Sequence, residues 1–200
     1  MKSGKYEVLV VGGGHAGCEA ALASSRLGSK TLLITGNLDT IGVMSCNPSI
    51  GGVGKGHLVR EIDALGGEMA KAADFASIQY RRLNTRKGPA VQATRIQADR
   101  SLYRTYMKKT IESQKNLHVK QRLIDSLIEK DSKIIGVKTN YGEEIYSNCV
   151  VVTPGTFPNG LIHIGDSQIS AGRAGEAPTK QISNSFKDLG FNVGRLKTGT

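Results

Sequence analysis

The first 35 residues place a glycine-rich turn between an apolar run and an alanine-rich segment. Residues 6–11 (YEVLVV) are typical of a buried strand, and the sequence GGGHAG follows at once. Residues 18–27 (CEAALASSRL) then predict a helix that ends at Gly28, and residues 30–35 (KTLLIT) predict a second strand. A strand, a glycine turn, a helix and a strand within about 30 residues form the β-α-β unit of dinucleotide-binding folds. We therefore predict an α/β protein with a Rossmann-like domain, whose nucleotide-binding unit is residues 6–35.

The turn has the spacing Gly12-x-Gly14-x-x-Gly17, in which each glycine has a separate role. The first permits a tight turn, the second lets the backbone approach a pyrophosphate, and the third lets the helix pack closely on the strand. The helix N-terminus then presents N–H groups to the phosphates. The acid expected about 20 residues further on, which would hold the ribose hydroxyls, is missing. The second strand ends in Thr35, and Asp39 comes late, so the pattern predicts a dinucleotide without identifying it.

The C-terminal half indicates which dinucleotide is bound. Residues 123–156 alternate apolar and polar residues around Asn140-Tyr-Gly, which predicts a small antiparallel meander. Its last strand ends in VVVTPGT, which resembles the second flavin-side signature of glutathione-reductase-like FAD proteins. There a glycine at the strand end, here Gly155, lets the backbone pass beside the cofactor. By this fold analogy the crossover favours FAD over NAD.

Residues 36–57 form a Cys/Gly-rich segment without a helical or strand period. Its run SCNPSIGGVGKGH is not a phosphate-binding P-loop. Gly56 stands where a Ser or Thr would bind magnesium, and Ser49 stands where the first glycine would be. A flexible surface loop is the plain alternative, but glycines here would also let a flat ring lie against the backbone. We predict an active-site loop.

The three cysteines fall in different predicted environments. Cys46 is the only one in a predicted loop, just before a turn-forming Asn-Pro, with Lys55 and His57 near in sequence. It is therefore the candidate reactive nucleophile. Cys18 lies in the predicted helix and Cys149 in a predicted strand, and both are interpreted as small core residues. An odd number of scattered cysteines argues against a disulfide framework and favours a reducing cytoplasm.

The positive charge of the chain is concentrated in one segment. The formal net charge is +10, from 27 Lys/Arg and 17 Asp/Glu. Residues 81–122 hold twelve Lys/Arg and two acids, so the rest of the chain is neutral. A solvated helix face is the usual meaning of such charges. The excess is interleaved with Tyr80, Tyr103 and Tyr106, however, which also fits contact with a nucleic-acid phosphate backbone.

The middle of the chain predicts four further elements. They are a short helix, a strand or extended segment, a long helix and a third strand, at residues 57–64, 74–83, 93–114 and 117–121. The four histidines are dispersed and form no metal-binding pattern, so no metal is expected. No apolar run approaches the length of a membrane span.

Several stretches together closely resemble one family. They are GGGHAGCEAA, MSCNPSIGGVGKGHLVREIDALGGEMAKAAD, LNTRKGPAVQATRIQADR, VVVTPGTFPNGLIHIG and GRAGEAP. This combination resembles the flavin subunit of the bacterial tRNA wobble-uridine carboxymethylaminomethyl-modification enzyme, the MnmG or GidA family. The resemblance covers essentially residues 1–200. It implies that they are the N-terminal part of an FAD-binding domain in a longer chain, which continues into a nicotinamide-binding region and a helical C-terminal domain.

The resemblance also implies an activity. FAD is reduced by NADH, and a one-carbon unit from methylenetetrahydrofolate passes to C5 of the wobble uridine of tRNA. Glycine or ammonium completes the side chain. The family works in the cytoplasm as a homodimer with a GTPase partner of the MnmE type. Without the later domains, the 200 residues alone are expected to be inactive.

The family's functional residues can be carried over by position. The resemblance implies that Ile124 contacts FAD, plausibly at its adenine end, and that Thr179 is a further cofactor contact. It implies that Cys46 acts either as a nucleophile towards uridine or in the folate and flavin chemistry. The residues implied to hold the FAD pyrophosphate are Gly12, Gly13, Gly14, His15, Ala16 and Gly17.

Three alternative functions share features with this sequence. The related folate- and FAD-dependent tRNA uridine methyltransferase uses similar cofactors, but HAG in the glycine turn and the intact SCNPSIGG argue against it. A flavin disulfide reductase needs a CxxC or CxxxxC pair, which the sequence lacks. A non-catalytic RNA-binding or assembly module would differ from the enzymes in binding no flavin.

Overall fold

The structure is a computed structural model that describes residues 6–172 and 182–196. Its centre is a six-stranded sheet in the order β6-β2-β1-β9-β8-β7. Four neighbouring strands, β6, β2, β1 and β9, are parallel, and β8 and β7 extend the sheet as an antiparallel meander from β9. The strands are β1 (Tyr6–Val11), β2 (Thr31–Thr35), β6 (Leu117–Gln121), β7 (Ile124–Lys130), β8 (Lys133–Thr139) and β9 (Glu144–Val152). The α/β fold and the meander expected from the sequence are confirmed.

Both faces of the parallel strands are covered, because alternate residues of β1 and β2 enter two different clusters. Val10 and Leu33 join the cluster formed with α1 (His15–Arg26) and α4 (Arg100–Ser113). Leu9 and Leu32 pack instead with the meander and with α5 (Ile182–Asp188). A parallel sheet buried on both faces explains why these strands are nearly continuous apolar runs.

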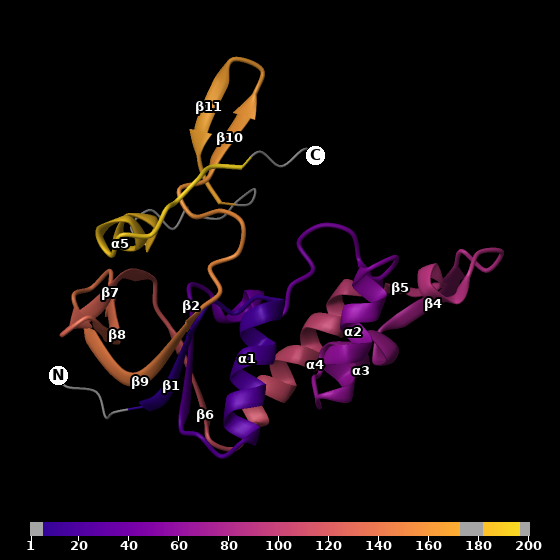
Figure 1. Cartoon of the computed structure of the whole chain (residues 1–200), viewed down its shortest axis with the longest axis horizontal. Coiled ribbons are helices and arrows are strands. Elements are labelled where there is room, and N and C mark those ends of the chain that lie inside the picture. The colour runs from indigo at the N-terminus through magenta and orange to yellow at the C-terminus, as the bar shows by residue number, and fades with distance from the viewer. Residues whose placement is uncertain (1–5, 173–181, 197–200) are drawn as a thin grey trace.

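A second group of elements lies beside α1 and α4 (Figure 1). A short sheet in the order β3-β5-β4 packs with α2 and α3, and β4 and β5 extend as an arm beyond these helices (Figure 1). A separate two-stranded hairpin, β10–β11, projects at the top of Figure 1, above α5. The elements are η1 (Leu38–Thr40), β3 (Ser49–Gly51), α2 (Lys55–Ala64), α3 (Met69–Phe75), β4 (Ser77–Leu83), η2 (Pro89–Val91), β5 (Ala93–Ala98), β10 (Leu161–Ile164) and β11 (Ser167–Ser170).

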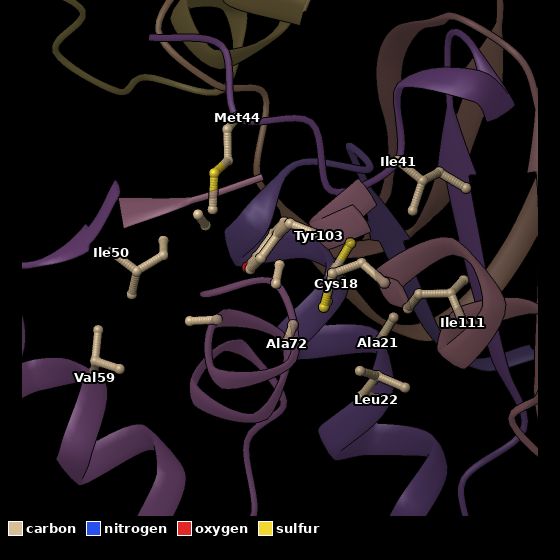
Figure 2. Close-up of a cluster of buried hydrophobic side chains, with 14 of the residues drawn as sticks. Cys18, Ala21, Leu22, Ile41, Met44, Ile50, Val59, Ala72, Tyr103 and Ile111 are labelled. Carbon is tan, nitrogen blue, oxygen red and sulfur yellow. The ribbon is translucent and has the colours of Figure 1, made fainter. Parts of the chain in front are cut away.

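The larger core cluster joins the β-α-β unit to this second group. Figure 2 shows Cys18 and Leu22 of α1, Ala72 of α3 and Tyr103 of α4 converging in it. Cys18 is fully buried, as the sequence predicts. Burial, and then the nearby charge of Glu19, raises the pKa of its thiol to about 12, so this cysteine is a neutral core residue.

Two sequence-based expectations are wrong. Residues 93–114 do not form one helix, because β5 pairs between β3 and β4 and Asp99 begins α4 by accepting a hydrogen bond from the backbone N–H of Leu102 (2.9 Å). Cys149 is not a core residue, because its side chain is exposed. Strands β3, β10 and β11 and helices α3 and α5 were not predicted. No helix in the described part of the chain is long and apolar enough to cross a bilayer.

A buried carboxylate ties α3 to the rest of the protein. Glu68 accepts hydrogen bonds from Arg26 (2.5 Å) and from the Tyr106 hydroxyl (2.8 Å). Burial alone would raise the pKa of Glu68, but the hydrogen bonds from Arg26 and Tyr106 outweigh burial and hold that pKa below the usual glutamate range. Glu19 of α1 accepts hydrogen bonds from the N–H groups of Glu68 and Met69, at the start of α3.

Glu68→Gln is expected to lower the free energy of unfolding by about 1–3 kcal/mol at neutral pH, because it removes a charge-assisted network that is largely buried. The folded-state pKa of Glu68 is lowered, so its stabilisation is complete above the unfolded-state pKa and is lost as pH falls through the folded-state pKa. Urea denaturation at several pH values should therefore show the gap between wild type and variant closing in acid. The exposed Glu61, which has no ion pair with a described residue, is the control, and Glu61→Gln should change little.

Candidate functional site

A groove of about 540 Å³ opens at the carboxyl ends of the parallel strands. Its walls come from the glycine turn after β1, the end of β2 with the residues that follow it, the residues between β6 and β7, the loop after β9 and the start of α5. Ligands of open α/β sheets bind outside the carboxyl ends of the strands. This groove is therefore the expected place for a dinucleotide.

The glycine turn packs backbone against backbone. Gly12 has a positive φ of +106°, and a methyl group there would overlap the carbonyl oxygen of Thr153 after β9. A methyl group at Gly17 would overlap the carbonyl oxygen of Gly12 and lie 2.8 Å from Thr153 Oγ1. A methyl group at Gly14 would meet nothing within 4 Å. Gly12 and Gly17 thus allow close backbone contacts between β1, α1 and the loop after β9, while Gly14 leaves open space at the start of α1.

The polar groups of the groove fit an anionic dinucleotide. The first turn of a helix offers N–H groups without intrahelical partners, and α1 begins at His15, on the groove wall. Arg122 also lines the groove, and among its described lining residues there is no carboxylate. The residues at the end of β2 that face it, Thr35 and Asn37, are neutral. The arrangement favours phosphate and leaves neutral groups where many dinucleotide folds place an acid.

Asp39 does not replace that missing acid. Its carboxylate pairs with Lys108 of α4 (2.7 Å) and does not line the groove. The hydrogen bond and charge of Lys108 lower the pKa of Asp39. Asn37 accepts a hydrogen bond from the Asp39 N–H (2.8 Å), which begins η1.

The structure brings together most of the residues predicted to bind the cofactor. Of the turn, Ala16 and Gly17 lie on α1 behind the groove wall rather than on it. Thr179 lies outside the described residues. Those that line the groove are Gly12, Gly13, Gly14, His15, Ile124 and Gly155. His15 is the first residue of α1 rather than part of the loop, and its Nδ1 lies 3.4 Å from the Tyr103 hydroxyl.

Cys46 lies beside the groove without lining it. Met44 is buried in the core, Ser45 lines the groove and Cys46 is exposed. The guanidinium of Arg100, the first residue of α4, donates a hydrogen bond to the Cys46 carbonyl. The N–H of Ala98 donates to the Pro48 carbonyl (2.8 Å). Hydrogen bonds from residues around the start of α4 therefore fix the backbone of this loop at Cys46 and at Pro48.

The groove residues that sequence reasoning did not single out include two polar ones, Arg122 and Asn37. Arg122 was counted only as one of the twelve bases of the basic segment, and Asn37 was not considered. The position of each could have been read from the strand ends, because Arg122 follows β6 directly and Asn37 follows β2 by two residues. Residues just after parallel strands meet at one edge of the sheet.

Comparisons of the sequence and of the structure with known proteins find similar proteins of one family. A family model described as "Glucose inhibited division protein A" matches residues 7–200. The tRNA uridine 5-carboxymethylaminomethyl modification enzyme MnmG of Desulfotalea psychrophila is 59% identical over 195 residues, 98% of this chain and 30% of that protein. The structure of Aquifex aeolicus GidA is 54% identical with a TM-score of 0.89, covering 92% of this chain and 31% of that one.

A more distant structure shares the fold alone. The GidA-related protein from Thermus thermophilus is 22% identical with a TM-score of 0.68, covering 94% of this chain and 69% of that one. The Rossmann-like fold of this chain is therefore also found at low sequence identity. This chain spans about 30% of the length of the curated relative that it matches.

Gly17→Ala should lower the free energy of unfolding by about 1–3 kcal/mol or prevent folding, because the added methyl group overlaps fixed backbone. Gly14→Ala is the matched control in the same turn. In the protein without FAD it should leave stability unchanged, since its methyl group meets open space. Thermal denaturation of the two variants side by side checks this. Equal loss of stability in both would show that the close packing described here is wrong.

Proposed function

This chain belongs to the family described as glucose inhibited division protein A, and from that premise we propose that it forms the FAD-binding part of an enzyme that modifies the wobble uridine of tRNA. The single observation that carries the cofactor assignment is the groove, with its glycine turn and no carboxylate among the described lining residues. The curated relative named as a tRNA uridine modification enzyme supports the substrate.

FAD supplies the redox chemistry of this proposal, with NADH and methylenetetrahydrofolate as co-substrates. The chain's own residues bind and orient it. The glycine turn and the start of α1 would hold the pyrophosphate, and Arg122, which also pairs with Glu143 (3.4 Å), lines the same groove. Ile124 would lie against the adenine end and Gly155 would let the backbone pass beside the ring. Thr179, outside the described residues, is proposed as a further contact.

Cys46 is the proposed nucleophile. Addition of its thiolate to C6 of the uridine would activate C5 for transfer of the one-carbon unit. An exposed thiol next to a groove-lining residue suits this role, because a nucleotide must reach it from solvent while the cofactor lies in the groove. A role in the folate and flavin chemistry is the alternative. Glycine or ammonium would complete the side chain.

The complete protein is proposed to act in the cytoplasm as a homodimer with a GTPase partner of the MnmE type. These assignments rest on the family to which the chain belongs. The 200 residues alone are proposed to be inactive.

The first test is the visible spectrum of the complete protein with and without added FAD. A bound-flavin spectrum supports the proposal. Gly14→Ala should weaken FAD binding by about tenfold or more, because its methyl group enters the space through which the backbone approaches the pyrophosphate. A protein that takes up no FAD would point instead to a non-catalytic RNA-binding or assembly module.

The role of Cys46 is tested by comparing two exposed thiols. Cys46→Ser should reduce tRNA modification to the background level while leaving the flavin spectrum unchanged. Cys149→Ser is the control, since Cys149 is also exposed but lies on β9. The measurement is incorporation of the labelled one-carbon unit into a tRNA transcript. Full activity of the Cys46 variant would exclude a nucleophilic role.

A further inference from the structure

The arm formed by β4, β5 and their connection carries positive charge without any compensating acid. Residues 77–98 contain no Asp or Glu. Within the described part of the chain, none of their basic side chains forms an ion pair. These side chains are Arg81, Arg82, Arg86, Lys87 and Arg95, and all are exposed. By contrast, Lys108, Lys120 and Arg122 of the basic segment have carboxylate partners.

Two of these arginines lie directly opposite each other. Arg81 of β4 pairs with Arg95 of β5 in the strand register, so the two side chains project from the same face. Like charges placed directly across a sheet are destabilising. The arrangement therefore costs stability in the isolated molecule, and an anionic ligand bound between the two would reverse the sign of that interaction.

The face that carries this pair is polar throughout its central part. Gln79 pairs with Gln97, and Gln97 pairs in turn with Ser49 of β3. We call the surface formed by these five residues, Gln79, Arg81, Arg95, Gln97 and Ser49, the arginine face. Arg95 donates a hydrogen bond to Ser49 Oγ (3.3 Å).

The other face of β3 and β5 is already occupied, because Ile50 and Ile96 are buried in the larger core cluster. Strand β4 is exposed on both of its faces, and Tyr80, opposite Ile96, lies in solvent. Strands β3 and β5 thus anchor the sheet, and the arginine face is presented to solvent. It adjoins the loop of the candidate nucleophile, because Ser49 follows Cys46 by three residues and Arg100, just after β5, contacts the Cys46 carbonyl.

We propose that the arginine face binds the phosphate backbone of the tRNA substrate and guides it to the Cys46 loop. This inference rests on the proposed function. Guanidinium groups bind phosphate through two parallel hydrogen bonds, and amide and hydroxyl side chains are common additional phosphate ligands. A protein partner fits less well, because the buried centre of a protein interface is mainly apolar, whereas the centre of this face is polar and charged.

The test measures binding of a labelled, unmodified tRNA transcript to the complete protein by fluorescence anisotropy across a range of salt concentrations. The double variant Arg81→Ala/Arg95→Ala should bind on the order of tenfold more weakly at physiological salt, and the slope of log K against log salt should become shallower by about two. Arg81→Lys/Arg95→Lys should keep most of the slope, since the charges remain.

The matched control is a second pair of exposed bases that face each other across strands. Lys130 and Lys133 are directly opposite in β7 and β8, away from the arm. Lys130→Ala/Lys133→Ala removes the same charge and should leave both affinity and slope close to wild type. An equal loss in this variant would mean that only net charge matters, and would overturn the proposal.

A further readout separates binding from folding. Without RNA, the Arg81→Ala/Arg95→Ala variant should melt at the same or a higher temperature, because a repulsive pair is removed. If this variant binds tRNA like the wild type, or changes only the oligomeric state, the arginine face is not an RNA surface. If the wild type modifies tRNA and the Arg81→Ala/Arg95→Ala variant binds tRNA normally, only this inference is overturned. If the wild type neither binds nor modifies tRNA, the proposed function is overturned.

Discussion

The contact on which the rest of the structure depends is the meeting of three backbones at the glycine turn. The N–H and the hydroxyl of Thr153 both donate to the Val11 carbonyl (2.8 Å each), while the N–H of Gly12 donates to the Ile34 carbonyl (2.7 Å). Strands β1, β2 and β9 are locked together at the point where the chain turns into α1. Side chains at positions 12 and 17 would separate these backbones. The groove, the start of α1 and the loop after β9 all take their places from this junction.

The second group of elements is positioned by polar contacts as well as by the core. Glu19 of α1 holds the start of α3, and Glu68 joins α3 to α1 and α4. Asp99, the N-cap of α4, in turn donates its N–H to the carbonyl of Ala76, just after α3 (2.8 Å). Because Arg100 and Ala98 flank Asp99 and hold the Cys46 loop, the thiol's position follows from how α3 and α4 are attached to the β-α-β unit. The position of the thiol beside the groove therefore depends on this packing as well as on its sequence neighbour Ser45, which lines the groove.

The accuracy of sequence-based prediction here depends on whether an element is defined locally. The strand, turn, helix and strand of residues 6–35 were predicted within a few residues, because the apolar runs and the glycines lie within one short segment. Residues 93–98 were predicted as helix, since ATRIQA has no strong strand signal of its own; they become a strand because β3 and β4 lie on either side. Cys149 was assigned to the core from its place in a strand, yet β9 turns that position to solvent.

By itself, the sequence determined the β-α-β unit, its glycine turn, the meander that follows and the concentration of charge in residues 81–122, since each depends on composition and spacing over short distances. Only the tertiary structure decided which of those charges are neutralised by carboxylates and which are left unpaired on the arm. It also decided that Arg122 reaches the groove, that Asp39 does not, and that Arg81 faces Arg95. The physical reason is that strand register and side-chain pairing join residues far apart in the chain, and no local pattern specifies such partners.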